Sequence, residues 1–214
     1  MKIVVGLPAY GGRVATCHAQ MWFAFGDKVA LHRSVVKSCH FVTVDVCGVD
    51  RARNLLLAHA MKLDANWLLM VDSDTWVDDG GLLLRMLIQA ERLDEERRIG
   101  IVGACVMRGV DGKEFPNVYQ FNDQGKHECV PAEEMPAGAD PRIHGPFLPV
   151  DALGAAVMAI NLRRVEEHMH FAFGEISEDL GFCKQMRETG AMIYCDPRIP
   201  THHLKSHVMD WKGV

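Results

Sequence analysis

The chain contains 214 residues, 49% of them hydrophobic and 24% charged, which excludes a disordered, collagen-like or low-complexity protein. Its net charge of −5 excludes a general attraction to nucleic acid or anionic membranes but allows a local basic groove. The longest stretch without Asp, Glu, Lys or Arg, from Val14 to Gly26, is shorter than the roughly 18 apolar residues of a membrane span. The seven cysteines include no CxxC pair, which favours free thiols in a reducing compartment. We therefore expect a cytoplasmic protein without membrane insertion.

In the first half of the chain, short apolar runs alternate with amphipathic segments. The runs predict strands at Lys2–Leu7, His40–Val46, Asn66–Val71 and Ile99–Val106. The first predicted helix begins at Thr16 and ends near Phe25, before Gly26. Two further helices are predicted from apolar faces at Ala52, Leu56, Ala60 and Leu63, and at Leu83, Met86, Leu87, Ala90 and Leu93. Strands that alternate with helices in this way predict a parallel sheet.

The second half of the chain has a different character. Residues 109–150 contain six of the nine prolines and no good helix, so we expect an irregular segment that closes over the site. Its apolar anchors are expected to be Phe115, Tyr119, Phe121 and Phe147. Beyond it, strands are predicted at Ala155–Ile160 and Ala191–Cys195, with a helix from about Ser177 to Thr189 between them. The predicted fold class is α/β, with three α/β/α layers and a mostly parallel sheet.

The tripeptide Asp72-Ser73-Asp74 directly follows the third predicted strand. In an extended chain, residues two apart point to the same side, so both carboxylates are expected to face one site. Open α/β sheets bind their ligands outside the carboxyl ends of the strands. Two hard oxygen donors there suit Mg²⁺ or Mn²⁺ shared with substrate phosphates. A turn that leads into a helix N-cap is the alternative interpretation.

Two later segments carry further candidates. Glu178 and Asp179 begin a predicted helix, where acidic residues next to an N-capping Ser177 also suit the helix dipole without any catalytic role. His202 and His203 follow the last predicted strand and can complete a metal site or belong to an exposed polar tail.

Five motifs follow one another from Ile3 to His203. They are a Gly-Leu-Pro loop, an Arg-Asn helix start, Leu-Leu-Met-Val-Asp-Ser-Asp, Glu-Asp-x-Gly-Phe-Cys and Asp-Pro…His. Their order and spacing resemble the GT-A glycosyltransferases, most closely the short, soluble family-2-like members of bacteria and their phages. The resemblance implies a GT-A (Rossmann-like) fold in one domain, 1–214. Residues 1–108 would bind the nucleotide sugar, and residues 109–214 would bind the acceptor and carry the catalytic groups.

The activity that the resemblance implies is metal-dependent transfer of a sugar from a nucleoside diphosphate sugar to an acceptor hydroxyl, with inversion. The Asp-x-Asp motif corresponds to Asp72 and Asp74, which would bind the donor and Mn²⁺ or Mg²⁺. The histidine that joins the metal corresponds to His203, with His202 as the alternative.

The resemblance also implies the general base and the donor site. The Glu-Asp motif corresponds to Glu178 and Asp179, with Asp179 as the expected base, Glu178 as its rival and Glu175 as a weaker candidate. The residues expected at the donor are Pro8, Tyr10 and Arg53. Tyr10 would stack on the nucleobase, or is a surface tyrosine; Arg53 would hold the diphosphate, or is a solvated arginine at a helix start.

Several features depart from the family pattern. The second strand is followed by Asp45-Val46-Cys47-Gly48 instead of Asp-Gly-Ser, and the Gln-x-x-Arg-Trp motif of processive synthases is absent. The main alternative function is a non-catalytic nucleotide- or carbohydrate-binding module of the same fold. A haloacid-dehalogenase-type phosphatase is a further alternative, although its Asp-x-Asp motif normally follows the first strand. The acceptor stays open among a glycan, a protein side chain, a small molecule and a modified nucleobase.

Overall fold

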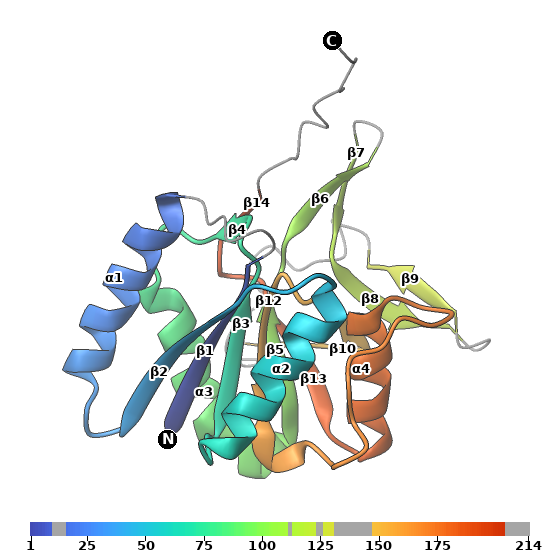
Figure 1. The fold of residues 1–214 in the computed structure, drawn as a ribbon. Helices are drawn as coiled ribbons and strands as arrows, with labels where there is room; N and C mark the ends of the chain where they lie inside the picture. The colour runs from blue at the N-terminus through green and yellow to red at the C-terminus, as the bar shows by residue number, and fades with distance from the viewer. Residues whose placement is uncertain (10–15, 111–112, 123–125, 131–146, 204–214) are drawn as a thin grey trace.

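The computed structural model describes residues 1–9, 16–110, 113–122, 126–130 and 147–203 (Figure 1). The central sheet has seven strands in the order β10-β13-β5-β12-β3-β1-β2. These strands are β1 (Lys2–Pro8), β2 (Ser38–Val44), β3 (Trp67–Val71), β5 (Ile99–Ala104), β10 (Leu148–Val150), β12 (Val157–Asn161) and β13 (Met192–Asp196). The helices are α1 (Thr16–Leu31), α2 (Val49–Lys62), α3 (Gly81–Arg97) and α4 (Glu178–Glu188), and a 3₁₀ turn spans Leu162–Arg164.

Short strands extend this core. β4 (Thr75–Trp76) pairs with β14 (His202–His203), and β6 (Met107–Val110) pairs with β7 (Lys113–Pro116). β8 (Val118–Phe121) lies between β9 (His127–Cys129) and β11 (Ala152–Leu153).

The directions of the central strands confirm an α/β fold with a mostly parallel sheet. β1 pairs in parallel with β2 and β3, and β13 pairs in parallel with β5. β12 is antiparallel to both β3 and β5, and β10 is antiparallel to β13. The sequence predicts β12 as a strand but not its place between β3 and β5, because strand order depends on pairing between segments far apart in the chain.

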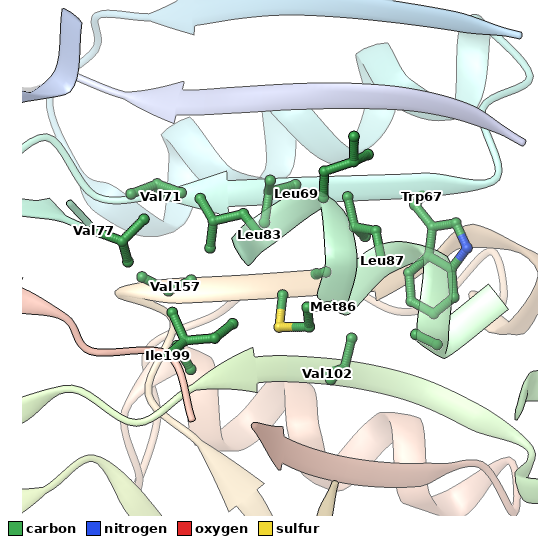
Figure 2. Close-up of a cluster of buried hydrophobic side chains, with 14 of the residues drawn as sticks. Trp67, Leu69, Val71, Val77, Leu83, Met86, Leu87, Val102, Val157 and Ile199 are labelled. Carbon is green, nitrogen blue, oxygen red and sulfur yellow. The ribbon is translucent and has the colours of Figure 1, made fainter. Parts of the chain in front are cut away.

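Buried hydrophobic clusters cover both faces of the sheet. On one face, α1 and α3 pack against it, and Figure 2 shows Leu83 and Leu87 of α3 next to Leu69 of β3, and Met86 of α3 next to Val102 of β5. On the other face, the cluster joins the sheet to α2 and α4, which Figure 1 shows in front of the strands. The sheet is therefore covered by helices on both sides, as the sequence predicts.

Helix α1 continues past Gly26 to Leu31, so the predicted end of this helix is wrong. Met21 and Phe25 are completely buried in the cluster with α3. A glycine inside a helix costs only about 1 kcal/mol relative to alanine, and burial of two large side chains outweighs that cost.

Replacement of Gly26 by alanine is expected to raise the free energy of unfolding by about 0.5–1 kcal/mol. A Cβ at Gly26 would meet no atom within 4 Å, so the methyl group fits without strain. The matched change Gly80→Ala should destabilise the protein, because a Cβ there would lie 2.0 Å from the carbonyl oxygen of Met21. Urea unfolding of both variants checks this, and a loss of stability in Gly26→Ala would contradict it.

The expectation of an irregular segment at 109–150 is wrong for its described part, which contains β7, β8, β9 and β10 and the end of β6. Its prolines are compatible with strands because Pro116 ends β7 and Pro149 lies on β10, an edge strand of the sheet. Among the expected aromatic anchors, Phe147 is completely buried, and Tyr119 and Phe121 are half-buried. Residues 131–146 and the side chain of Phe115 lie outside the described part.

All seven cysteines are free. Across the described residues, no helix is both long and apolar enough to cross a membrane.

Candidate functional site

The candidate site lies at the carboxyl end of β3, where Asp72 and Asp74 follow the strand. The chain turns here instead of extending, because the amide of Thr75 donates to the carbonyl oxygen of Asp72 at 3.0 Å. The argument that both carboxylates share one face, which assumed an extended chain, therefore does not apply. The two carboxylates instead bind different partners, Arg53 and His203.

Arg53 connects two acidic residues that are far apart in the sequence. Its Nη2 donates to both oxygens of Asp72, at 3.0 and 3.1 Å, and its Nη1 donates to Oε1 of Glu178. The arginine is only 3% exposed. Burial disfavours its charge, but Asp72 and Glu178 outweigh burial and raise the pKa of Arg53. Arg53 is thus a buried, ion-paired residue and not a solvated arginine, and its role at a diphosphate stays a prediction.

The position of Arg53 follows from the local structure of α2. Gly48 precedes the helix with a φ of 97°, a conformation that residues with a Cβ rarely adopt. The next residue after Arg53, Asn54, holds the loop that leads to α4. Its side chain donates to the carbonyl oxygen of Phe171 at 2.7 Å and accepts from the amide of Phe171 at 2.8 Å. The guanidinium of Arg53 also lies 6.0 Å from the centre of the Phe171 ring.

Both acids at the start of α4 are buried, but their contacts differ. Burial raises the pKa of Glu178, and Arg53 opposes this rise only in part. Asp179 accepts hydrogen bonds from the amides of Ala155 and Leu180, at 3.1 and 2.9 Å, and from the hydroxyl of Ser177. The Asp179 carboxylate therefore anchors the start of α4 to the segment before β12. Glu175, the weaker candidate for the base, is exposed and lines a separate pocket along α4.

The pairing of β4 with β14 brings His203 to the candidate site. His203 lies opposite Thr75 in this pair, and its Nε2 is 3.3 Å from Oδ2 of Asp74. His202 points elsewhere: its Nε2 lies 3.1 Å from Oδ2 of Asp78, and its ring stacks on Trp76. Of the two histidines, it is His203 that the structure places beside Asp74.

Sequence reasoning missed His18, which lies in the first turn of α1 and is 1% exposed. Neither ring nitrogen has a hydrogen-bond partner among the described residues. Burial lowers the pKa of His18, and the backbone of Thr75 and the charge of Asp74 partly offset this effect. Its place at the start of α1, the helix that follows β1, is the signal that points to it.

Of the residues expected at the donor, Pro8 is described and Tyr10 lies outside the described residues. Pro8 ends β1 and lines an apolar recess of about 120 Å³ together with Val46, Gly48, Val49 and Ala52. This recess lies between the carboxyl ends of β1 and β2 and the start of α2, the edge of the sheet where α/β folds bind ligands.

Asp74 and His203 can hold a divalent cation, whereas Asp72 is engaged by Arg53. The described residues contain no group of three or more His, Cys, Asp or Glu arranged to hold a metal. The described residues therefore offer a cation two protein ligands, one carboxylate oxygen from Asp74 and one imidazole nitrogen from His203. This donor set suits Mn²⁺ or Mg²⁺ when phosphate oxygens and water supply the other ligands.

Comparisons with known proteins bear on the fold alone. The chain is similar to the crystal structure of A197 from STIV, with a TM-score of 0.59 and 14% sequence identity. The match covers 95% of this chain and 85% of that chain. At this identity the likeness shows a common fold and carries no statement about function. No protein-family model matches the chain, and no curated protein matches it.

Proposed function

We propose that the protein is a metal-dependent glycosyltransferase of the GT-A fold that moves a sugar from a nucleoside diphosphate sugar to an acceptor hydroxyl. The observation that carries the proposal is the pair Asp74 and His203, which are 129 positions apart and lie 3.3 Å from each other at the carboxyl end of β3. This pair lies next to Asp72, which is bound through Arg53 to Glu178. The proposed metal ligands and a candidate base thus lie on either side of the turn at Asp72–Asp74, which supports transfer over simple binding.

Asp74 and His203 would hold Mn²⁺ or Mg²⁺, which neutralises the charge that develops on the leaving diphosphate. The apolar recess at Pro8 offers a surface for the nucleobase. Burial lowers the pKa of His18, which favours the neutral form of this histidine near Asp74.

In the proposed reaction, a carboxylate takes the proton from the acceptor hydroxyl. The hydroxyl oxygen of the acceptor then bonds to the anomeric carbon of the donor sugar. The bond from that carbon to the diphosphate breaks, and the nucleoside diphosphate leaves. Asp179 is the base that the Glu-Asp motif implies, but its oxygens already accept three hydrogen bonds. We favour Glu178, because burial raises its pKa and makes it a better proton acceptor.

The metal role predicts that Asp74→Asn abolishes stabilisation by a nucleoside diphosphate with Mn²⁺. At one hundred times its Kd, such a ligand stabilises the wild type by about 2.7 kcal/mol, which raises Tm by about 5–10 °C. Asp78→Asn is the matched control, because this exposed carboxylate pairs with His202 instead of His203. Thermal unfolding with a panel of nucleoside diphosphates, with and without Mn²⁺, measures the difference. Equal shifts in Asp74→Asn and the wild type would remove Asp74 from the metal site.

A second measurement separates transfer from binding. Incubation with nucleoside diphosphate sugars and a panel of acceptors should release the free nucleoside diphosphate. Stabilisation by the donor without hydrolysis or transfer across the panel would favour the non-catalytic binding module instead.

A further inference from the structure

The two edge strands of the central sheet differ in how well they are protected against pairing with another chain. At one edge, β10 has three residues, and Pro149 at its centre cannot donate a ladder hydrogen bond. At the other edge, β2 has seven residues and pairs with β1 over its whole length without a bulge (Figure 1). The sequence of β2 contains no proline and no lysine, arginine or acidic residue, which are the residues that usually protect an edge strand. Its outer edge can therefore act as a template for a further strand.

The hydrogen bonds between β1 and β2 show which residues would pair with that further strand. The amide of Ala9 donates to the carbonyl oxygen of Val44 at 2.9 Å, so Val44 and every second residue before it direct their backbone groups to β1. Cys39, Phe41 and Thr43 alternate with them and direct their amide and carbonyl groups away from the sheet. Among the described residues, no strand pairs with this outer edge.

Aromatic side chains are exposed beside the same edge. Phe41 is 53% exposed, and its ring centre lies 5.6 Å from that of Trp22 and 6.1 Å from that of Phe25, both on α1. Phe23, the residue between them in sequence, is 76% exposed. Covering Phe23 and Phe41 would bury about 250 Å² of apolar surface, which is about a third of what one partner buries in a standard protein interface.

The side of α1 next to this edge carries no charge. Four residues recur there at intervals of four, three and four positions: Ala19, Phe23, Gly26 and Ala30. Trp22 lies beside this row and contacts Phe41, which places the row on the β2 side of the helix. A Cβ at Gly26 would meet no atom within 4 Å, so the surface is open there. A second helix can therefore approach α1 closely along this side.

The charges that flank β2 favour a second copy of the same strand as its partner. Lys37 directly precedes the strand and Asp45 directly follows it, and both are exposed. Each lies four positions from Phe41. In an antiparallel pair with Phe41 opposite Phe41, Lys37 of each copy lies beside Asp45 of the other. In the same register, the outward groups of Cys39 meet those of Thr43. A strand of unrelated sequence would not supply this match at both ends.

We propose that the protein forms a homodimer in which two β2 strands pair antiparallel about a two-fold axis at Phe41. The two seven-stranded sheets then join into one continuous sheet. The α1 helices lie side by side on one face of that sheet, with Phe23 and Phe41 covered at the interface. Because a two-fold pair uses the same edge of both copies, the assembly closes at two chains. The inference goes beyond the proposed transferase activity and does not depend on it.

Sedimentation velocity of the full chain over a range of protein concentrations tests the proposal. The wild type should sediment as a dimer at micromolar concentrations. Phe41→Glu should raise the dissociation constant of the dimer by about a hundredfold or more, because it removes an apolar contact and places two like charges opposite each other at the axis. Phe173→Glu is the matched control, since Phe173 is 63% exposed in the segment that leads to α4. This variant should dimerise like the wild type.

Further variants separate loss of the interface from loss of the fold. Thr43→Pro removes an outward amide but none of the hydrogen bonds to β1, so it should weaken the dimer while urea unfolding of the monomer changes little. Lys37→Glu should weaken the dimer by about tenfold, because like charges then meet at both ends. The double variant Lys37→Glu/Asp45→Lys should restore the affinity. Asp74→Asn should dimerise like the wild type, which keeps failure of this proposal distinct from failure of the active-site assignment.

Three results would overturn the proposal. A wild type that stays monomeric over the whole concentration range would leave the edge of β2 to a different partner. A dimer that persists in folded Phe41→Glu and Thr43→Pro would place the interface elsewhere on the surface. A double charge variant that dimerises no better than Lys37→Glu would exclude the antiparallel register centred on Phe41.

Discussion

Arg53→Met is expected to lower the free energy of unfolding by about 3–5 kcal/mol, because it leaves the carboxylates of Asp72 and Glu178 without their common cation. Arg51→Met is the matched control on the same helix. Arg51 is exposed, so its loss should change stability by less than about 0.5 kcal/mol. Addition of Glu178→Met to Arg53→Met should recover part of the loss. Urea unfolding of the wild type and the three variants measures these differences.

The effect of Arg53→Met should also depend on pH. Burial raises the pKa of Glu178 in the folded protein above its unfolded value, so this group lowers stability as pH rises from the unfolded pKa through the folded pKa. Loss of Arg53 raises the folded pKa further. The destabilisation should therefore be larger at pH 7 than at pH 4.5. An equal loss at both values, or a loss no larger than that of Arg51→Met, would contradict the role assigned to this arginine.

Glu178→Gln is expected to lower the rate of transfer by about 10²–10⁴-fold, because the amide cannot take the proton of the acceptor hydroxyl. Its carbonyl oxygen can still accept from Arg53, so donor binding with Mn²⁺ should persist. Asp179→Asn is expected to act mainly on stability, with a loss of about 1–3 kcal/mol, because an amide cannot accept all of the hydrogen bonds that hold α4. Glu175→Gln, at an exposed position, is the control for both.

The readouts are product formation by the folded fraction, urea unfolding, and thermal shift with donor and Mn²⁺. A rate loss of that size in Asp179→Asn with unchanged unfolding would assign the base to Asp179, as the Glu-Asp motif implies. Near-wild-type turnover in both variants would remove both residues from the role of base. An α-linked product from an α-linked donor would contradict an inverting reaction.

The sequence alone was sufficient to predict the α/β class and most of the regular elements of the first half of the chain. Its apolar runs have the length and composition of strands buried on both faces, and Trp67–Val71 is completely buried in the structure. Local patterns determine such elements because burial and periodicity are properties of neighbouring residues. The same reasoning was wrong at Gly26, where packing of α1 on α3 outweighs the helix-breaking tendency of glycine.

The sequence was sufficient to predict which residues belong to the candidate site, but not which of them contact one another. The sequence singled out Arg53, Asp72, Asp74, Glu178 and His203, yet nothing local indicates that Arg53 binds two carboxylates. That arrangement requires α2, the end of β3 and the start of α4 to meet, and those segments are up to 125 positions apart. The choice between His202 and His203 likewise depends on the register of β4 with β14, because adjacent residues of a strand point to opposite sides.

The order of strands and the exposed edge at β2 were decided only by the tertiary structure. β12 has the apolar pattern of any buried strand, and its place between β3 and β5 follows from pairing across the whole sheet. Trp22 and Phe41 lie on different elements and meet at that edge only because α1 packs beside β2. Local periodicity thus determines which residues are buried, whereas contacts between distant segments determine which charged groups meet, since those contacts depend on the packing of whole elements.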